Sequence, residues 1–117
     1  MKKGEIYHIN TPSPDGYYRH HFVYWDNNGT KSYIGIMITH AVPERYANNI
    51  PLMDSHFKEG FKVENESSHF VACKLIKDVP ISNLELTGEL TAEGIEYIES
   101  HLFSVATITW AEYKRSI

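Results

Sequence analysis

The sequence predicts a mainly β protein: a strongly curved antiparallel sheet followed by one long C-terminal α-helix. Two observations carry this prediction. Most of the chain consists of short β-branched and aromatic runs that are separated by turn-forming clusters of Gly, Pro, Asn and Asp. One stretch, from Ala92 to about Thr107, instead places its apolar residues at helical spacing, and Thr91 before it is a suitable N-cap. The apolar stripe of that helix comprises Ile95, Ile98, Leu102 and Val105.

The strongest local signal is a hairpin from Arg19 to Thr39, in which two apolar runs flank Asn28-Gly29. This dipeptide favours a two-residue type I′ turn, because Asn and Gly accept the positive φ angles that such a turn requires. Both faces of the two strands are apolar, so we expect both to be covered, the outer one by a helix or a second subunit. The first face carries Val23, Trp25, Ile34, Ile36 and Ile38, and the second carries Phe22, Tyr24, Tyr33 and Met37.

The turn also predicts the register of the hairpin. A two-residue turn makes Tyr18 face Thr39 and makes His20 face Met37, whereas a one-residue bulge would pair Arg19 with Thr39. We take the open end of the hairpin as the candidate functional site. In either register this end gathers the polar side chains of Arg19, His20, Thr39 and His40.

The remaining elements follow from the same signals. A first strand spans Gly4–Asn10, and the Pro-containing stretch Thr11–Gly16 is a loop. Ile50–Met53 is expected at a sheet edge, because its proline cannot donate a ladder hydrogen bond. Roughly five to seven short strands with one helix favour closure as a small SH3-like antiparallel barrel. The further strands are expected at Phe61–Val63, His69–Ile76 and Leu84–Leu86.

Composition places the chain among ordinary globular proteins. Its 117 residues are expected to form one domain, 1–117, with a short tail from about residue 108 whose structure the pattern does not specify. No apolar run suits a spanning helix, and the first residues lack the apolar core of a signal peptide. Cys73 has no second cysteine to pair with and is expected to pack in a strand, which favours a cytoplasmic location.

Charge and histidine content restrict the ligands. The net charge of -4 disfavours a non-specific nucleic-acid coat, although a local basic groove is compatible with it. The 7 histidines show no metal-ligand spacing, and no Gly-rich phosphate loop is present. The sequence therefore predicts no metal and no other cofactor.

Four stretches, in their order and spacing, resemble the MazF/PemK/Kid toxin endoribonucleases. The opening KKGEIYHIN is similar to the first strand of that family, and GYYRHHFVYW stands where the family has G-x-R-P-x-[LV]-[VI], with Arg19 at the arginine. YIGIMITHA stands where the family has a strand ending in P-[IL]-T, with Thr39 at the threonine. HFVACKLIKDVPISNL and LTGELTAEGIEYIESHL resemble the family's later strand and closing helix. The chain departs from the pattern at His20, which replaces a proline, and at Leu75–Asp78, which replaces Gln-x-Arg-Thr.

The resemblance implies a homodimeric SH3-like barrel that cleaves single-stranded RNA without a metal ion, has no membrane association and is inhibited by a cognate antitoxin protein. In the implied reaction the ribose 2′-OH attacks the adjacent phosphodiester, which leaves a cyclic phosphate and a 5′-OH. Arg19 and Thr39 would hold the phosphate, and His20 or His40 would transfer protons. Because consecutive strand residues point to opposite faces, at most one of His20 and His21 can share a site with Arg19.

Four further residues have two interpretations. Lys74 and Lys77 either bind RNA phosphates or are simply solvated. Tyr17 and Tyr18 either stack on RNA bases or line the barrel mouth or the dimer contact. A second hypothesis for the whole chain is a MazF/PemK-like barrel without catalytic activity that binds protein or nucleic acid. The absent Gln-x-Arg pattern and the pI near 5.9 favour that hypothesis.

Overall fold

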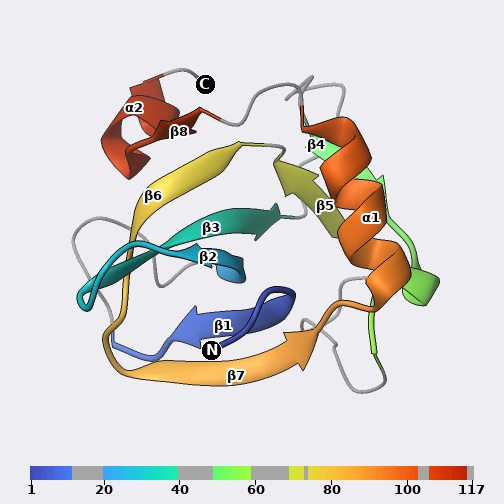
Figure 1. Cartoon of the computed structure of the whole chain (residues 1–117), viewed down its shortest axis with the longest axis horizontal. Helices are drawn as coiled ribbons and strands as arrows, with labels where there is room; N and C mark the ends of the chain where they lie inside the picture. The colour runs from blue at the N-terminus through green and yellow to red at the C-terminus, as the bar shows by residue number, and fades with distance from the viewer. Residues whose placement is uncertain (12–19, 40–48, 59–68, 73, 103–105, 116–117) are drawn as a thin grey trace.

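The computed structural model describes residues 1–11, 20–39, 49–58, 69–72, 74–102 and 106–115 (Figure 1). As expected, the described chain is mainly β, but two short helices take the place of one long helix. The helices are α1 (Ala92–His101), α2 (Trp110–Arg115) and the short 3-10 helix η2 (Asp54–His56). The strands are β1 (Glu5–Ile9), β2 (His21–Asn27), β3 (Ser32–Thr39), β4 (Asn49–Leu52), β5 (His69–Ala72), β6 (Leu75–Pro80), β7 (Leu84–Glu89) and β8 (Thr107–Ile108).

Strand β3 lies inside the sheet and organises it. One edge of β3 pairs with β2, and its other edge is shared by β6 near Ser32 and by β5 near Thr39. The main path of the sheet runs β4-β5-β3-β2-β1-β7, so β4 is an outer strand, which confirms the expected edge position of Ile50–Met53. An isolated bridge between Phe57 and Leu90 connects the segment after β4 to the end of β7. The sheet therefore curves into a barrel-like form.

The expected single strand His69–Ile76 is wrong. Strand β5 ends at Ala72, and β6 starts at Leu75 and continues through Asp78 to Pro80. The apolar pattern does not reveal this break, because both strands pair in turn with the same edge of β3. Strand β6 also pairs with β8 in parallel, so the sheet is mixed and not purely antiparallel. Three predicted features lie outside the described residues. They are the strand Phe61–Val63, the place of Val105 in the helical stripe and the packing of Cys73.

The β2–β3 hairpin forms, but with a longer turn than expected. Phe22 pairs with Met37 and Asn27 pairs with Tyr33, with a register shift between Tyr24 and Asp26. In the turn Gly29 has a φ of 90°, but Asn28 is not among the residues with positive φ, so the turn is not type I′. The Asn28 side-chain amide instead donates to the Ser32 hydroxyl (3.2 Å) and to the carbonyl of Lys77. These bonds close a wider loop against β6.

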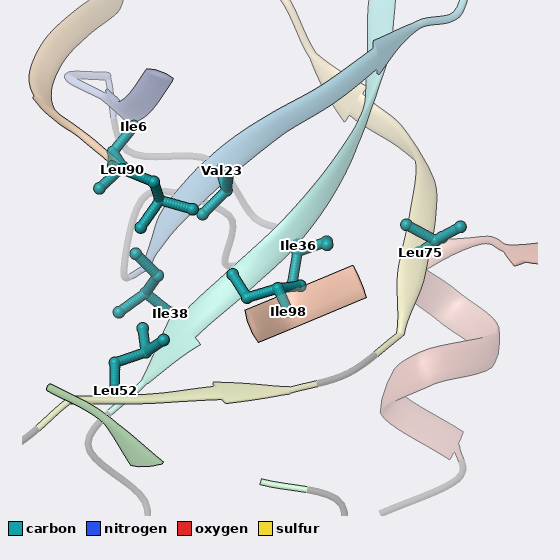
Figure 2. Close-up of a cluster of buried hydrophobic side chains, with 8 residues drawn as sticks. All are labelled: Ile6, Val23, Ile36, Ile38, Leu52, Leu75, Leu90 and Ile98. Carbon is teal, nitrogen blue, oxygen red and sulfur yellow. The ribbon is translucent and has the colours of Figure 1, made fainter. Parts of the chain in front are cut away.

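The predicted register is therefore wrong, because Met37 faces Phe22 and not His20. At the open end the error is two residues, and the apolar side chains of both strands keep their predicted faces. One face packs in a cluster with α1, and Figure 2 shows its buried members, Ile6, Val23, Ile36, Ile38, Leu52, Leu75, Leu90 and Ile98. The other face packs in a cluster with α2 that comprises Ile9, Phe22, Tyr33, Met37, Ile76, Val79, Trp110 and Tyr113. We call these the α1-side and α2-side clusters.

The C-terminal region differs most from the prediction. Helix α1 begins at Ala92, where the Thr91 hydroxyl accepts a hydrogen bond from the Gly94 amide (3.1 Å), which confirms the expected N-cap. It ends at His101 and does not reach Thr107, which belongs to β8. Helix α2 follows. Its start is stabilised by a capping box, in which the Glu112 amide donates to the Thr109 hydroxyl (3.1 Å) and the Thr109 amide donates to the Glu112 carboxylate (3.0 Å).

Candidate functional site at the open end of the hairpin

The structure describes half of the residues that the sequence nominates for a site. Four of them are described, namely His20, Thr39, Lys74 and Lys77. The other four, Arg19, His40, Tyr17 and Tyr18, lie outside the described residues. The geometry of the site is therefore built from the strands that end beside these positions, β2 and β3, and from their neighbour β1.

His20 and Thr39 lie together at the open end on the α2 side. The register of the hairpin pairs His21 with Ile38, and its continuation by one residue places His20 opposite Thr39. The His20 ring meets the ring of Trp110 edge to face, with centroids 6.1 Å apart. Only 8% of Thr39 is exposed, so the residue is buried. The His20 ring thus contacts the α2-side cluster through Trp110, and Thr39 is buried opposite His20.

The two lysines lie elsewhere along β3. The Lys77 carbonyl accepts a hydrogen bond from Asn28, which places Lys77 beside the turn of the hairpin. Its neighbour Ile76 pairs with Gly35, four residues before Thr39, which is a separation of about 13 Å along a strand. Lys74 precedes β6 and is half-buried. The backbone of Lys77 is therefore not brought to the open end of the hairpin, and Lys74 is the nearer of the two.

Lys77 belongs to the surroundings of α2. Hydrogen bonds from the amide and hydroxyl of Thr109 lower the pKa of the Glu112 carboxyl, and the charges of Lys77 and Arg115 lower it further. The Asp78 side chain, next to Lys77, accepts a hydrogen bond from the Trp110 amide (2.7 Å). These contacts give this part of β6 a structural role, which is to fix the start of α2.

The open end holds a second polar group, on the α1 side, that sequence reasoning missed. His8 of β1 and His21 of β2 are directly paired, and their rings stack with centroids 4.8 Å apart and an interplanar angle of 28°. The Nδ1 atom of His21 lies 3.0 Å from the hydroxyl of Thr87 on β7. That hydroxyl in turn donates to the carbonyl of Ile6 (3.2 Å). Both histidines are partly exposed.

The sequence does not show this group because it does not show which strands pair. His8 and His21 are thirteen positions apart, and neither residue forms a recognisable motif with the other. Only the β1–β2 register brings the two rings together, and only the β1–β7 pairing adds Thr87. The alternation of β1, which places His8 on the same face as Ile6, was the one available hint.

Three groups of the sheet have pKa values that are shifted by their surroundings, namely Tyr7, Tyr33 and Glu89. Burial, followed by a hydrogen bond to the Glu5 carboxylate, raises the pKa of the Tyr7 phenol to about 12. Burial also raises the pKa of Tyr33. Contact with the ammonium group of Lys58, supported by Lys2, lowers the pKa of Glu89.

No group of three or more His, Cys, Asp and Glu side chains within the described ranges is arranged to hold a metal ion. In the same part of the chain, no helix combines the length and apolar character that crossing a membrane requires. Comparison of the chain with protein-family models, curated proteins and solved structures finds no match.

Proposed function

We propose that the chain is a toxin-type endoribonuclease of the MazF/PemK kind, which cleaves single-stranded RNA without a metal ion. The observation that carries the proposal is the stacked imidazole pair of His8 and His21 at one end of β1 and β2, with His20 on the opposite face of the same end. Imidazole is the side chain best suited to move protons near neutral pH. The barrel-like sheet with a helix after β7 is compatible with the SH3-like barrel that the sequence resemblance implies.

The reaction needs three contributions from the protein. A base removes the proton of the 2′-OH, an acid protonates the leaving 5′-oxygen, and a cation or donor stabilises the charge on the phosphate. Arg19 is the residue we assign to the phosphate, because its planar guanidinium matches two phosphate oxygens. An imidazole at the open end of the hairpin transfers the protons. In this proposal the chain acts as a homodimer in the cytoplasm and is inhibited by an antitoxin protein.

The direct test is incubation of the purified chain with single-stranded RNA in the presence of EDTA. We expect cleavage that leaves a cyclic phosphate and a 5′-OH, and no cleavage of the same oligonucleotide made with 2′-deoxyribose. Arg19→Ala should abolish cleavage, whereas Glu96→Ala, an exposed residue of α1, should not change it. Intact RNA after prolonged incubation over a wide pH range would refute the proposal.

The second candidate function is a barrel of the same kind that binds RNA or protein without catalysis. The observation that favours it is the burial of Thr39, which is only 8% exposed and so offers a phosphate little surface. Fluorescence anisotropy with a labelled oligonucleotide separates the two functions, because a binding module retains the intact strand. Growth arrest on expression, relieved by Arg19→Ala, would favour the nuclease.

A further inference from the structure

Thr87 determines which nitrogen of His21 carries the proton. A hydroxyl has a single hydrogen, and Thr87 donates it to the carbonyl of Ile6. While Thr87 directs that hydrogen to Ile6, Nδ1 of His21 is the donor in its 3.0 Å contact with the Thr87 oxygen. A neutral imidazole with a proton on Nδ1 has its lone pair on Nε2. The bond to Thr87 thus prepares Nε2 of His21 to accept a proton.

His8 places a second imidazole against the first. The two rings are stacked at 4.8 Å, a distance at which two positive charges repel each other. Acid–base catalysis uses two such groups side by side, one that accepts a proton and one that donates a proton. Among the described residues of the neighbouring strands, Glu85 of β7 is paired with His8, and Ile38 of β3 is paired with His21. As the cross-strand partner of His8, Glu85 lies on the same face of the sheet.

We infer that His21 and His8 are the proton-transfer pair of the proposed nuclease, with Thr87 as the residue that positions His21. The inference rests on the proposed function and names the base and the acid within it. Nε2 of His21 takes the proton of the ribose 2′-OH as its oxygen forms a bond to phosphorus. The bond from phosphorus to the 5′-oxygen breaks, and that oxygen receives the proton held by His8. The products are a 2′,3′-cyclic phosphate and a 5′-OH, and the pair is left with the same total number of protons.

This assignment separates the reacting atoms from the α2 side of the hairpin. His20 lies on the opposite face and packs against Trp110, whereas His21 and His8 stack on each other and are partly exposed. The two faces cannot both hold the same scissile phosphate. A comparison of His21 with His20 therefore decides which face reacts.

The kinetic experiment replaces each histidine by phenylalanine, which keeps a ring but removes the proton-carrying nitrogens. We expect His21→Phe and His8→Phe each to lower kcat for RNA cleavage by about 100-fold or more. His101→Phe, at the end of α1 with Nδ1 bonded to the Tyr97 carbonyl (2.7 Å), is the matched control and should keep its activity. Thr87→Val should lower kcat about tenfold with little change in KM, and Thr87→Ser, which retains the hydroxyl, should restore it.

The outcomes separate this inference from the proposed function. If the wild type cleaves RNA and His21→Phe cleaves equally well, while His20→Phe loses activity, the proton-transfer pair lies on the α2 side and the inference is overturned. If the wild type leaves RNA intact, the proposed function fails and the catalytic role of His21 fails with it. Equal activity of the Thr87→Val and Thr87→Ser variants would remove the positioning role of Thr87.

A spectroscopic experiment tests the geometry without relying on activity. Imidazole ¹⁵N chemical shifts of the full chain should show neutral His21 protonated on Nδ1, and Thr87→Val should lose that preference. Addition of uridine 3′-monophosphate should shift the His8 and His21 resonances and leave those of His101 unchanged. A proton on Nε2 of neutral His21, or a response confined to His20, would overturn the assignment even in an active protein.

Discussion

Gly94 is the position at which the packing of α1 can be tested most sharply. The residue lies in the first turn of α1, where the helix rests on η2. A Cβ atom at Gly94 would come within 2.4 Å of the carbonyl oxygen of His56, which is backbone and cannot rotate away. To reach even 3.0 Å, α1 would have to move by about 0.6 Å (3.0 − 2.4). The same junction holds two bonds, from the Thr91 amide to the His56 carbonyl and from the Thr91 hydroxyl to the Ser55 carbonyl, both 2.9 Å.

The magnitude of Gly94→Ala follows from opposing contributions. Alanine in place of glycine gains about 1 kcal/mol of helix propensity. Overpacking costs about 1–3 kcal/mol, and weakening of the two Thr91 bonds costs about 0.5–1.5 kcal/mol each. The clash therefore dominates, and we expect a net loss of about 1–5 kcal/mol in the free energy of unfolding. For a chain of this size that loss lowers Tm by roughly 4–20 °C.

Urea unfolding followed by tryptophan fluorescence measures this loss. Glu96→Ala on the exposed face of α1 is the control and should change the free energy of unfolding by less than about 0.5 kcal/mol. A Gly94→Ala variant as stable as the wild type, or more stable, would show that α1 does not rest on η2 as closely as described.

Three further predictions concern stability. Thr91→Ala should lower the free energy of unfolding by about 1 kcal/mol through loss of the N-cap, whereas Thr91→Ser should keep most of it; equal urea midpoints for the two variants would contradict this. Trp110→Ala should cost about 3–5 kcal/mol, because the residue is 6% exposed and packs against Phe22 and Tyr113, and a thermal shift near zero would mean that α2 does not cover the sheet. Tyr7 has a pKa raised from 10.0 to about 12, so the unfolded chain ionises first; its stabilising contribution is present below pH 10.0 and is lost as the pH rises to about 12. Urea midpoints measured over that range should fall less steeply for Tyr7→Phe, and identical slopes would refute the assignment.

The faces of the hairpin were predictable, and its register was not. The alternation of Val23 and Phe22 with their neighbours separates the α1-side and α2-side clusters correctly, because side-chain direction depends only on parity. The turn at Asn28 depends on a hydrogen bond to Lys77, a residue 49 positions away, and no local turn rule includes such a contact. Long-range polar contacts of this kind are what the sequence alone could not supply.

Part of the C-terminal structure that the prediction missed could have been predicted from the sequence. Thr109 and Glu112 are three residues apart, which is the spacing of a capping box, and they mark the start of α2. The apolar stripe of α1 continued in phase as far as Val105 and concealed the end of the helix at His101. At the candidate site, Thr39 and His20 lie on one face as the alternation requires. The partnership of His8 with His21 needed the β1–β2 pairing, which sequence spacing does not encode.

The apolar character of both faces of β2 and β3 has a consequence for how the chain selects its alignment. In most sheets a slip by one position exposes apolar side chains to water, but here it would only exchange one buried set of apolar side chains for another. The correct register of the hairpin must therefore be selected by the volumes of the side chains. Gly35 fills this role, since a Cβ there would meet the ring of Tyr33 and a methyl group of Val79, each at 3.0 Å, and a slip would force Ile34 or Ile36 into that slot. Libraries that preserve only the polar and apolar pattern of this hairpin should yield many proteins with the wrong register, unless they also keep glycine at position 35.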